Sequence, residues 1–165
     1  MRRIAVIGNG GGGKSTLCRT LGERLGVPVH EVDRVQFRPD WSQTPPDEVE
    51  RVLDGWLRAD AWIVDGFGPW PAIERRLAAA DTVVWVDFPL RTHLWWTAKR
   101  QIRWRRTADG RGRPSTRLMF ATILRVHRRL HGTIESAVRA RPEKLVHVRS
   151  PRELRDFLEN AGAKR

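Results

Sequence analysis

A glycine-rich run near the amino terminus constrains this chain more than any other feature of its sequence. Residues 8–15 read GNGGGGKS, which satisfies the pattern G-x-x-x-x-G-K-S/T between an apolar run and a segment with helical spacing. In such a run, backbone N–H groups surround phosphate oxygens, the lysine reaches the β- and γ-phosphates, and the serine hydroxyl binds Mg²⁺. The run therefore predicts a site for a nucleoside triphosphate, formed by Gly8, Gly10, Gly11, Gly12, Gly13, Lys14, Ser15 and Thr16.

The rest of the chain alternates between strand-like and helix-like segments. Short apolar runs typical of strands buried on both faces cover residues 3–7, 27–32, 62–64, 82–86 and 145–148. Helices are expected over residues 14–25, 46–59 and 151–160. This order predicts an α/β fold with a doubly wound, five-stranded parallel sheet and helices on both faces. A chain of 165 residues fits one domain, so we expect residues 1–165 to form a single unit.

A basic, lid-like insert over residues 91–141 separates the last two predicted strands. It contains 14 Lys and Arg residues but only two acidic ones, whereas the rest of the chain is balanced. Two helices are expected, over residues 92–106 and from Ser115 or Thr116 onward, joined by a glycine-rich basic loop at 109–114 that suits a closing lid. Their buried faces are expected to carry Leu94, Ala98 and Ile102, then Phe120, Ile123, Leu124, His127 and Leu130.

Three aspartates end predicted strands, where a parallel sheet gathers its functional groups. Asp65 ends the third strand and is expected to hold Mg²⁺ through water, although a simple turn aspartate before Gly66 is the alternative. Asp33 ends the second strand and would face the phosphoryl acceptor, but a helix cap or a partner for Arg34 explains it equally well. Asp87 follows the fourth strand and is expected to cap the next helix.

Absent elements narrow the class of nucleotide-binding protein. The chain has no Asn/Thr-Lys-x-Asp element of the kind that GTPases use to bind the base, and Asp65 is not followed by the glutamate of transporter and AAA ATPases. A small chain with a lid-like insert fits P-loop kinases better. One cysteine, Cys18, excludes an internal disulfide, and the apolar runs are too short for a membrane span or a signal peptide. We expect a cytoplasmic protein with no membrane partner.

Several motifs together resemble one family of P-loop proteins. They are GNGGGGKST, VDRVQFRPDW after the second strand, WIVDGFGPW at the third, VVWVDFP at the fourth and the arginine-rich KRQIRWRR. Over residues 3–150 the chain resembles the adenylate-kinase-related proteins known as DNA topology modulation proteins. The resemblance implies the nucleoside-monophosphate-kinase fold with strand order 2-3-1-4-5, ATP and Mg²⁺ as cosubstrates, and an arginine lid. It also implies that Ser150 and Pro151 lie beside the adenine ring.

The chain departs from adenylate kinases at a point that concerns the acceptor. Adenylate kinases have DGFPR after the third strand, where the arginine grips the acceptor's phosphate, whereas this chain has DGFGPW. The departure favours a hydroxyl acceptor in an aromatic pocket, with Asp33 taking the hydroxyl proton. The residues expected to bind the acceptor are Asp33, Trp41, Asp65 and Trp70. The residues expected in the core instead are Cys18, Trp62, Trp85 and Trp95.

Two functions are compatible with the basic insert. In a kinase, Lys14, Arg100, Arg103 and Arg106 would stabilise the phosphoryl group as it moves from ATP to a small-molecule or nucleotide acceptor. In the alternative, the arginine-rich insert would bind nucleic acid in an ATP-binding regulatory protein. Two or three arginines suffice for catalysis, so the surplus leaves nucleic-acid binding open, and we expect kinase activity first.

Overall fold

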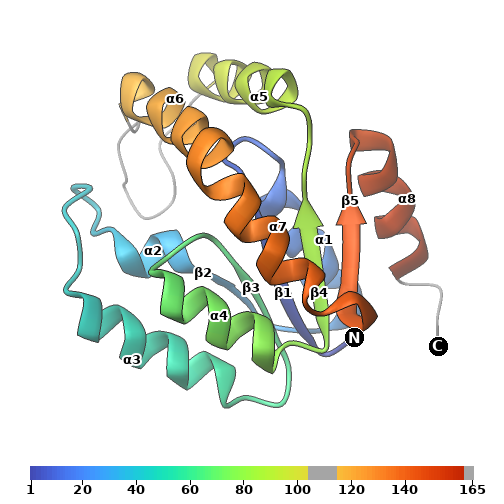
Figure 1. Ribbon diagram of the computed structural model, residues 1–165. Coiled ribbons are helices and arrows are strands. Elements are labelled where there is room, and N and C mark those ends of the chain that lie inside the picture. Colours follow the sequence, from blue (N-terminus) through green and yellow to red (C-terminus); the bar gives the residue numbers. More distant parts are fainter. Residues whose placement is uncertain (104–114, 162–165) are drawn as a thin grey trace.

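The computed structural model describes residues 1–103 and 115–161, and its centre is a parallel β-sheet (Figure 1). The strands pair in the order β2-β3-β1-β4-β5, as predicted. In the register, Ala5 of β1 lies opposite Val64 of β3 and Val83 of β4, so β1 is the central strand. The bounds of the strands are β1 Arg3–Gly8, β2 Val29–Glu31, β3 Trp62–Asp65, β4 Thr82–Val86 and β5 Leu145–Val148.

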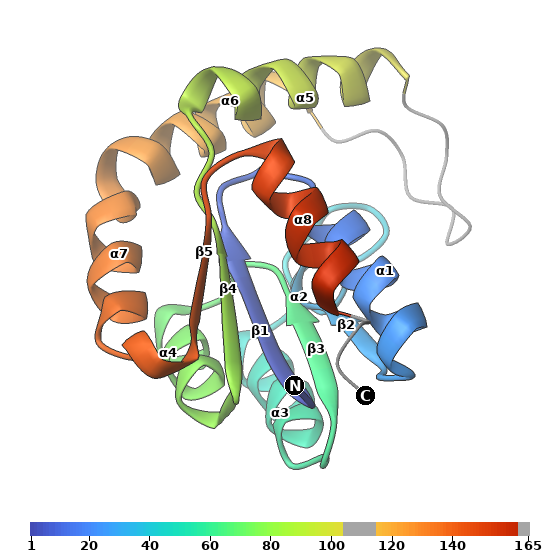
Figure 2. The same ribbon diagram turned by 90° about the vertical axis from the view of Figure 1, so that its right-hand side faces the viewer.

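Helices cover both faces of the sheet (Figure 2). Ile4 of β1 faces α1 and α8, and its neighbour Ala5 faces α3, α4 and α7, because successive strand residues point to opposite faces. Trp62, Trp85 and Cys18 are buried, as predicted. No helix in the described ranges is long and apolar enough to cross a membrane. The bounds are α1 Lys14–Leu25, α2 Val32–Gln36, α3 Pro46–Leu57, α4 Trp70–Ala79, α5 Leu90–Ile102, α6 Thr116–Arg125, the π-helix η1 Val126–Leu130, α7 His131–Arg139, the 3-10 helix η2 Pro142–Lys144 and α8 Pro151–Ala161.

The topology gathers several chain segments at the carboxyl ends of the strands. The chain leaves β1 through the glycine-rich loop, and β3 and β4 lie on either side of β1. In open parallel sheets, the crevice for a ligand lies at this edge, where the order of strands reverses. Helices α5 and α6 lie across the same edge in Figure 1. Groups that follow β1, β3 and β4 therefore lie at the same edge of the sheet as α5 and α6.

The second strand is shorter than the prediction of 27–32. It ends at Glu31, and Val32 begins α2. Val32 is fully buried in the core, but it belongs to α2. Its apolar side chain extends the pattern that predicts the longer strand. Asp33 consequently lies in the first turn of α2 and not at the end of a strand.

The buried face of α5 differs from the predicted one. The sequence predicts an apolar face that includes Ile102, but Ile102 is 85% exposed and the helix buries His93, Thr97 and Gln101. Trp95, which was expected in the core, is 59% exposed. The inner face of α5 is therefore polar, and its apolar contact with the core comes from Trp96, which packs against Phe88. The partner of the polar face is the glycine-rich loop, as described below.

The second helix of the insert begins as predicted and then changes its pitch. Ser115 caps α6 by accepting a hydrogen bond from the N–H of Leu118 at 3.4 Å, and Ile123 is buried. The prediction that His127 is buried is wrong, because His127 is exposed. Val126, where the π-helix η1 begins, takes the inner position instead, three residues after the buried Ile123.

Replacing Gly22 by alanine should destabilise the fold, although alanine favours helices. A Cβ at Gly22 in α1 would lie 2.4 Å from Val29 Cγ2 and 3.0 Å from the carbonyl oxygen of Val27. Relieving such overpacking costs about 1–3 kcal/mol, which exceeds the gain of about 1 kcal/mol in helix propensity. Gly55→Ala in α3 is the matched control, because a Cβ there meets nothing within 4 Å. Urea unfolding should show a loss for Gly22→Ala and none for Gly55→Ala; equal stabilities would contradict this packing.

Candidate active site

The loop between β1 and α1 has a backbone conformation that glycine permits. Gly11 and Gly13 have φ angles of 69° and 76°, in the left-handed region that other residues rarely adopt. Gly13 directly precedes α1, so the unpaired N–H groups of the first helical turn open toward the loop. Ser15 and Thr16 lie in this first turn and are exposed. Backbone donors and the positive end of the helix dipole thus face one space, which suits an anionic phosphate.

Lys14 closes the loop from its carboxyl end. Its Nζ donates a hydrogen bond to the backbone carbonyl of Asn9 at 2.9 Å, across the loop. Lys14 is only half-buried, so a ligand can reach it at this edge of the sheet. A phosphate oxygen competes well for its ammonium group, because a hydrogen bond between two charged partners is stronger than one to a neutral carbonyl.

The serine and the aspartate that the sequence assigns to Mg²⁺ are in direct contact. Ser15 Oγ donates to Asp65 Oδ2 at 2.8 Å, from positions far apart in the chain. Asp65 is 4% exposed, and its Oδ1 accepts a bond from the N–H of Gly66 at 2.7 Å. Proteins bind Mg²⁺ through one or two oxygen ligands together with substrate phosphates. A hydroxyl and a carboxylate side by side next to the loop fit this ion.

Asp33 lies against the turn that follows β3. A Cβ at Gly66 would lie 3.2 Å from Asp33 Oδ1. Desolvation by the surrounding protein raises the pKa of Asp33, although the residue as a whole is exposed, and the charge of Lys14 opposes this shift. Burial lowers the pKa of Arg100 in α5, and the carboxylate of Asp33 opposes that shift. The structure thus brings Asp33, Lys14 and Arg100 into one region of the carboxyl edge.

A buried arginine that the sequence analysis does not single out supports the same turn. Arg76 of α4 is 2% exposed, and its Nη2 donates to the carbonyl of Gly66 at 2.8 Å. Burial lowers the pKa of Arg76 to about 10, while Asp65 and Asp33 favour its charged form, so the group is cationic at neutral pH. Because it is enclosed behind the turn, Arg76 does not replace the acceptor-gripping arginine of adenylate kinases.

The polar face of α5 lies against the outside of the glycine-rich loop. His93 Nδ1 lies 2.8 Å from the carbonyl oxygen of Gly10, which can only accept, so Nδ1 carries the proton. Burial lowers the pKa of His93, which favours a neutral ring. Thr97 is fully buried, and a Cβ at Gly11 would lie 2.2 Å from Thr97 Oγ1. Because buried backbone carbonyls require donors, a helix that packs on this loop needs a polar face.

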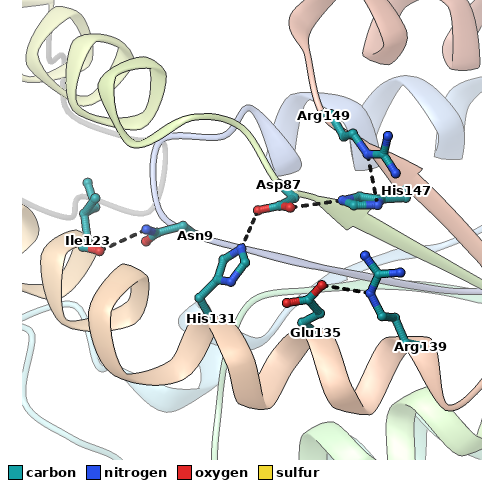
Figure 3. A network of polar contacts seen from close by, with 8 residues as sticks. All are labelled: Asn9, Asp87, Ile123, His131, Glu135, Arg139, His147 and Arg149. Atoms are coloured by element: carbon teal, nitrogen blue, oxygen red, sulfur yellow. Dashed lines mark hydrogen bonds and ion pairs between the residues drawn. The ribbon is translucent and has the colours of Figure 1, made fainter.

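The loop is also bonded to α6. Asn9 Nδ2 donates to the carbonyl of Ile123 at 2.9 Å, and Asn9 Oδ1 accepts from the N–H of Gly10 at 2.7 Å. Figure 3 shows the Asn9 side chain reaching from the loop to this helix. Both helices of the basic insert therefore contact the loop directly. The pattern G-x-x-x-x-G-K-S/T allows any residue at the position of Asn9, so the motif does not predict this bond.

The prediction that Asp87 caps the next helix is wrong. Pro89 occupies the cap position of α5, and the Asp87 carboxylate accepts hydrogen bonds from two histidines (Figure 3). His131 Nε2 lies 2.8 Å from its Oδ1, and His147 Nε2 lies 3.0 Å from its Oδ2. Trp85 stacks on His147 with ring centroids 4.2 Å apart. Asp87 thus ties β4 to β5 and α7, which anchors the carboxyl end of the basic insert to the sheet.

An aromatic groove lies beside the end of the loop. Its lining residues are Arg91, Thr92, Trp95, Trp96 and Pro151. Trp96 approaches the loop closely, since a Cβ at Gly13 would lie 2.9 Å from Trp96 Cζ3. Ser150 caps α8 by accepting a bond from the N–H of Glu153 at 3.2 Å. The resemblance places Ser150 and Pro151 beside adenine. Pro151 lines this groove next to the glycine-rich loop.

The two tryptophans expected in an acceptor pocket lie on different elements. Trp41 is at the tip of a hairpin closed by a bridge between Phe37 and Gln43, and it has a φ of 67°, which is unusual for a residue with a side chain. Trp70 begins α4, and its indole N–H donates to Glu74 at 2.8 Å. Their part in acceptor binding stays a prediction.

The structure describes two of the three arginines expected in a lid, Arg100 and Arg103. Arg100 Nη2 lies 3.5 Å from Met119 Sδ of α6, so it bridges the two helices of the insert. Arg103 is exposed directly after the end of α5. Arg106 and the predicted hinge at 109–114 lie outside the described residues.

The sheet order, the glycine-rich loop ahead of α1 and the Ser15–Asp65 contact define a P-loop fold of the nucleoside-monophosphate-kinase type. Among solved structures, the chain is similar to a shikimate kinase from Acinetobacter baumannii in complex with shikimate, with a TM-score of 0.59 and 17% sequence identity over 97% of this chain and 90% of that chain. At this identity the similarity shows the fold alone. No family model and no curated protein matches the sequence, so the resemblance to DNA topology modulation proteins stays a prediction.

Proposed function

We propose that the protein is a kinase that moves the γ-phosphate of ATP to a hydroxyl group of a small acceptor, with Mg²⁺ bound. The observation that carries this proposal is the Ser15–Asp65 contact of 2.8 Å beside Lys14, at the carboxyl edge of a sheet with the kinase order of strands. A glycine-rich turn without catalytic use has no need of a carboxylate from another strand beside its serine. The contact therefore favours a metal–nucleotide site.

Each group around the glycine-rich loop would have its own role in phosphoryl transfer. Phosphoryl transfer needs positioning and charge stabilisation more than covalent help from the protein. Loop N–H groups and Lys14 would hold the phosphates, and Ser15 and Asp65 would hold Mg²⁺, which supplies further charge neutralisation when bound. Arg100 of α5 interacts electrostatically with Asp33 and would add a positive charge near the transferred group. These groups together favour the negative charge that develops on the transferred group.

The acceptor side favours a hydroxyl group over a phosphate. Arg76 is enclosed behind the Gly66 turn and cannot grip a phosphate in the crevice. Asp33, by contrast, is exposed beside the same turn and can accept a proton from a hydroxyl group. Shikimate, which the structurally similar kinase binds, is a small hydroxylated acid and belongs to this class of acceptor.

A thermal-shift screen tests the proposal. The full chain is heated with Mg²⁺ and the ATP analogue AMP-PNP, then with added sugars, hydroxy acids, nucleosides and nucleoside monophosphates. We expect AMP-PNP to raise the melting temperature and one hydroxylated class to raise it further, because each ligand stabilises the folded state by RT ln(1 + [L]/Kd). Phosphate release from ATP in the presence of that class then measures transfer.

Two results of the screen would contradict the proposal. Failure of AMP-PNP to stabilise the protein would remove the nucleotide site. Tight binding of DNA with a log–log salt slope near −5, modulated by ATP and without any transfer, would favour the nucleic-acid-binding alternative.

A further inference from the structure

Thr97 of α5 has a hydroxyl group that is buried and has no hydrogen-bond partner within residues 1–103 and 115–161. A helical threonine ordinarily satisfies its hydroxyl by donating to the carbonyl four residues earlier, which here belongs to His93. Buried polar groups without partners are rare, because leaving them unpaired is unfavourable. Valine has the same shape and would avoid the cost. The hydroxyl therefore requires an explanation.

The unpaired hydroxyl lies against the outside of the glycine-rich loop. A Cβ at Gly11 would lie 2.2 Å from Thr97 Oγ1 and 2.5 Å from the carbonyl oxygen of His93. One helical turn earlier, His93 Nδ1 already donates to the carbonyl of Gly10 at 2.8 Å. Helix α5 thus presents two donors to two successive residues of the loop. The first donor has its partner, and the second has none among the residues that the structure describes.

Phosphate binding changes what the loop requires. The loop holds phosphate through N–H groups that point inward, and the carbonyl of the same peptide group then points outward. Lys14 Nζ bonds the carbonyl of Asn9, and a phosphate that draws this lysine away frees the loop to readjust. Gly11 has a positive φ of 69°, and glycine exchanges conformations of this kind without steric cost.

We propose that Thr97 is a positioning residue for nucleotide binding: when phosphate enters the loop, the carbonyl of Gly11 turns outward and accepts a hydrogen bond from Thr97 Oγ1. Together with the His93–Gly10 bond, this contact fixes the inward direction of the loop N–H groups. The proposal rests on the nucleotide site of the proposed function. It adds that the first helix of the basic insert stabilises the phosphate-bound form of the loop.

The substitution Thr97→Val tests this role, because it removes the hydroxyl and keeps the shape. Calorimetry with Mg²⁺ and AMP-PNP should show an affinity that is weaker by about 3- to 10-fold, the worth of one neutral hydrogen bond. The protein without nucleotide should melt at the same temperature or about 2–4 °C higher, because an unpaired buried hydroxyl has been removed. Thr97→Ser keeps the hydroxyl and should bind AMP-PNP as the wild type does.

Thr82→Val is the matched control. Thr82 is also buried, but its hydroxyl donates to Asp81 at 2.8 Å at the opposite end of the sheet. This variant should melt earlier and bind AMP-PNP normally, the reverse of Thr97→Val. Wild-type affinity in Thr97→Val, or weak binding in Thr97→Ser, would overturn the proposal. If Thr97→Val does not fold, Thr97→Ala carries the same test. Absence of AMP-PNP binding to the wild type would instead contradict the proposed function.

Discussion

Replacing Lys14 by alanine should abolish phosphoryl transfer and leave the protein folded. Within residues 1–103 and 115–161, its ammonium group donates to the carbonyl of Asn9 at 2.9 Å from a half-buried position, so little structure depends on it. In transfer, the same group would stabilise charge on the β- and γ-phosphates in a partly enclosed site. Removing one such donor lowers kcat by about 10²–10³-fold, and the loss of a full charge is expected to cost at least as much.

The matched control for this experiment is Lys144→Ala. Lys144 also donates to a backbone carbonyl, that of Ala78 at 3.2 Å, but it precedes β5 at the opposite end of the sheet. Transfer rates and circular dichroism are measured on both variants. Lys144→Ala should keep the wild-type rate, and both variants should keep the wild-type spectrum. A Lys14→Ala protein that transfers phosphate at the normal rate would remove the loop from the active site.

The sequence is sufficient for the order of the strands and for the glycine-rich loop at the carboxyl edge of the sheet. The glycine-rich run and its neighbours define the loop between β1 and α1 through local pattern alone. The contact of Ser15 with Asp65 follows from topology, because adjacent parallel strands end at the same edge of the sheet. These features depend on backbone geometry that many sequences share. They are for that reason the most predictable.

The orientation of α5 could not be derived from apolar periodicity. Apolar periodicity indicates a helix that buries its apolar side chains, but the inner face of α5 packs on the backbone of the glycine-rich loop, where His93 meets the carbonyl of Gly10. Donors at His93 and Thr97 therefore point inward, while Trp95 and Ile102 are left outside. A polar stripe with helical spacing, read together with the glycines, is the signal that would have indicated this arrangement.

Arg76 shows a second limit of the sequence. It lies between Ile73 and Leu77 on the buried face of α4, so the helical spacing does indicate burial. The buried guanidinium of Arg76 is stabilised by the carbonyl of Gly66, ten residues earlier, and by the carboxylates of Asp65 and Asp33. Such a contact depends on how the chain returns to the turn after β3. Neither charge nor spacing indicates it before the fold is known.

Asp33→Asn should lower kcat by about 10²–10⁴-fold, which corresponds to roughly 3–5 kcal/mol of barrier. A hydroxyl acceptor must lose its proton as it attacks, and Asp33 is the exposed carboxylate beside the Gly66 turn. Desolvation raises the pKa of Asp33, which makes it a stronger base than an ordinary aspartate. Asparagine keeps the shape but cannot take the proton. The affinity for AMP-PNP should barely change, because Lys14 and the loop hold the phosphates.

Stability and pH separate this role from a structural one. Because the folded protein disfavours the ionised form of Asp33, its neutral replacement should melt at the wild-type temperature or slightly above it at pH 7. The wild-type rate should fall as the pH drops through the raised pKa of Asp33, and the Asp33→Asn rate should not follow that step. Asp54→Asn, which alters a surface contact with Arg75, is the control and should leave the rate unchanged. Near-normal kcat in Asp33→Asn would make Asp33 a structural residue. A phosphate group would then be favoured over a hydroxyl group as the acceptor.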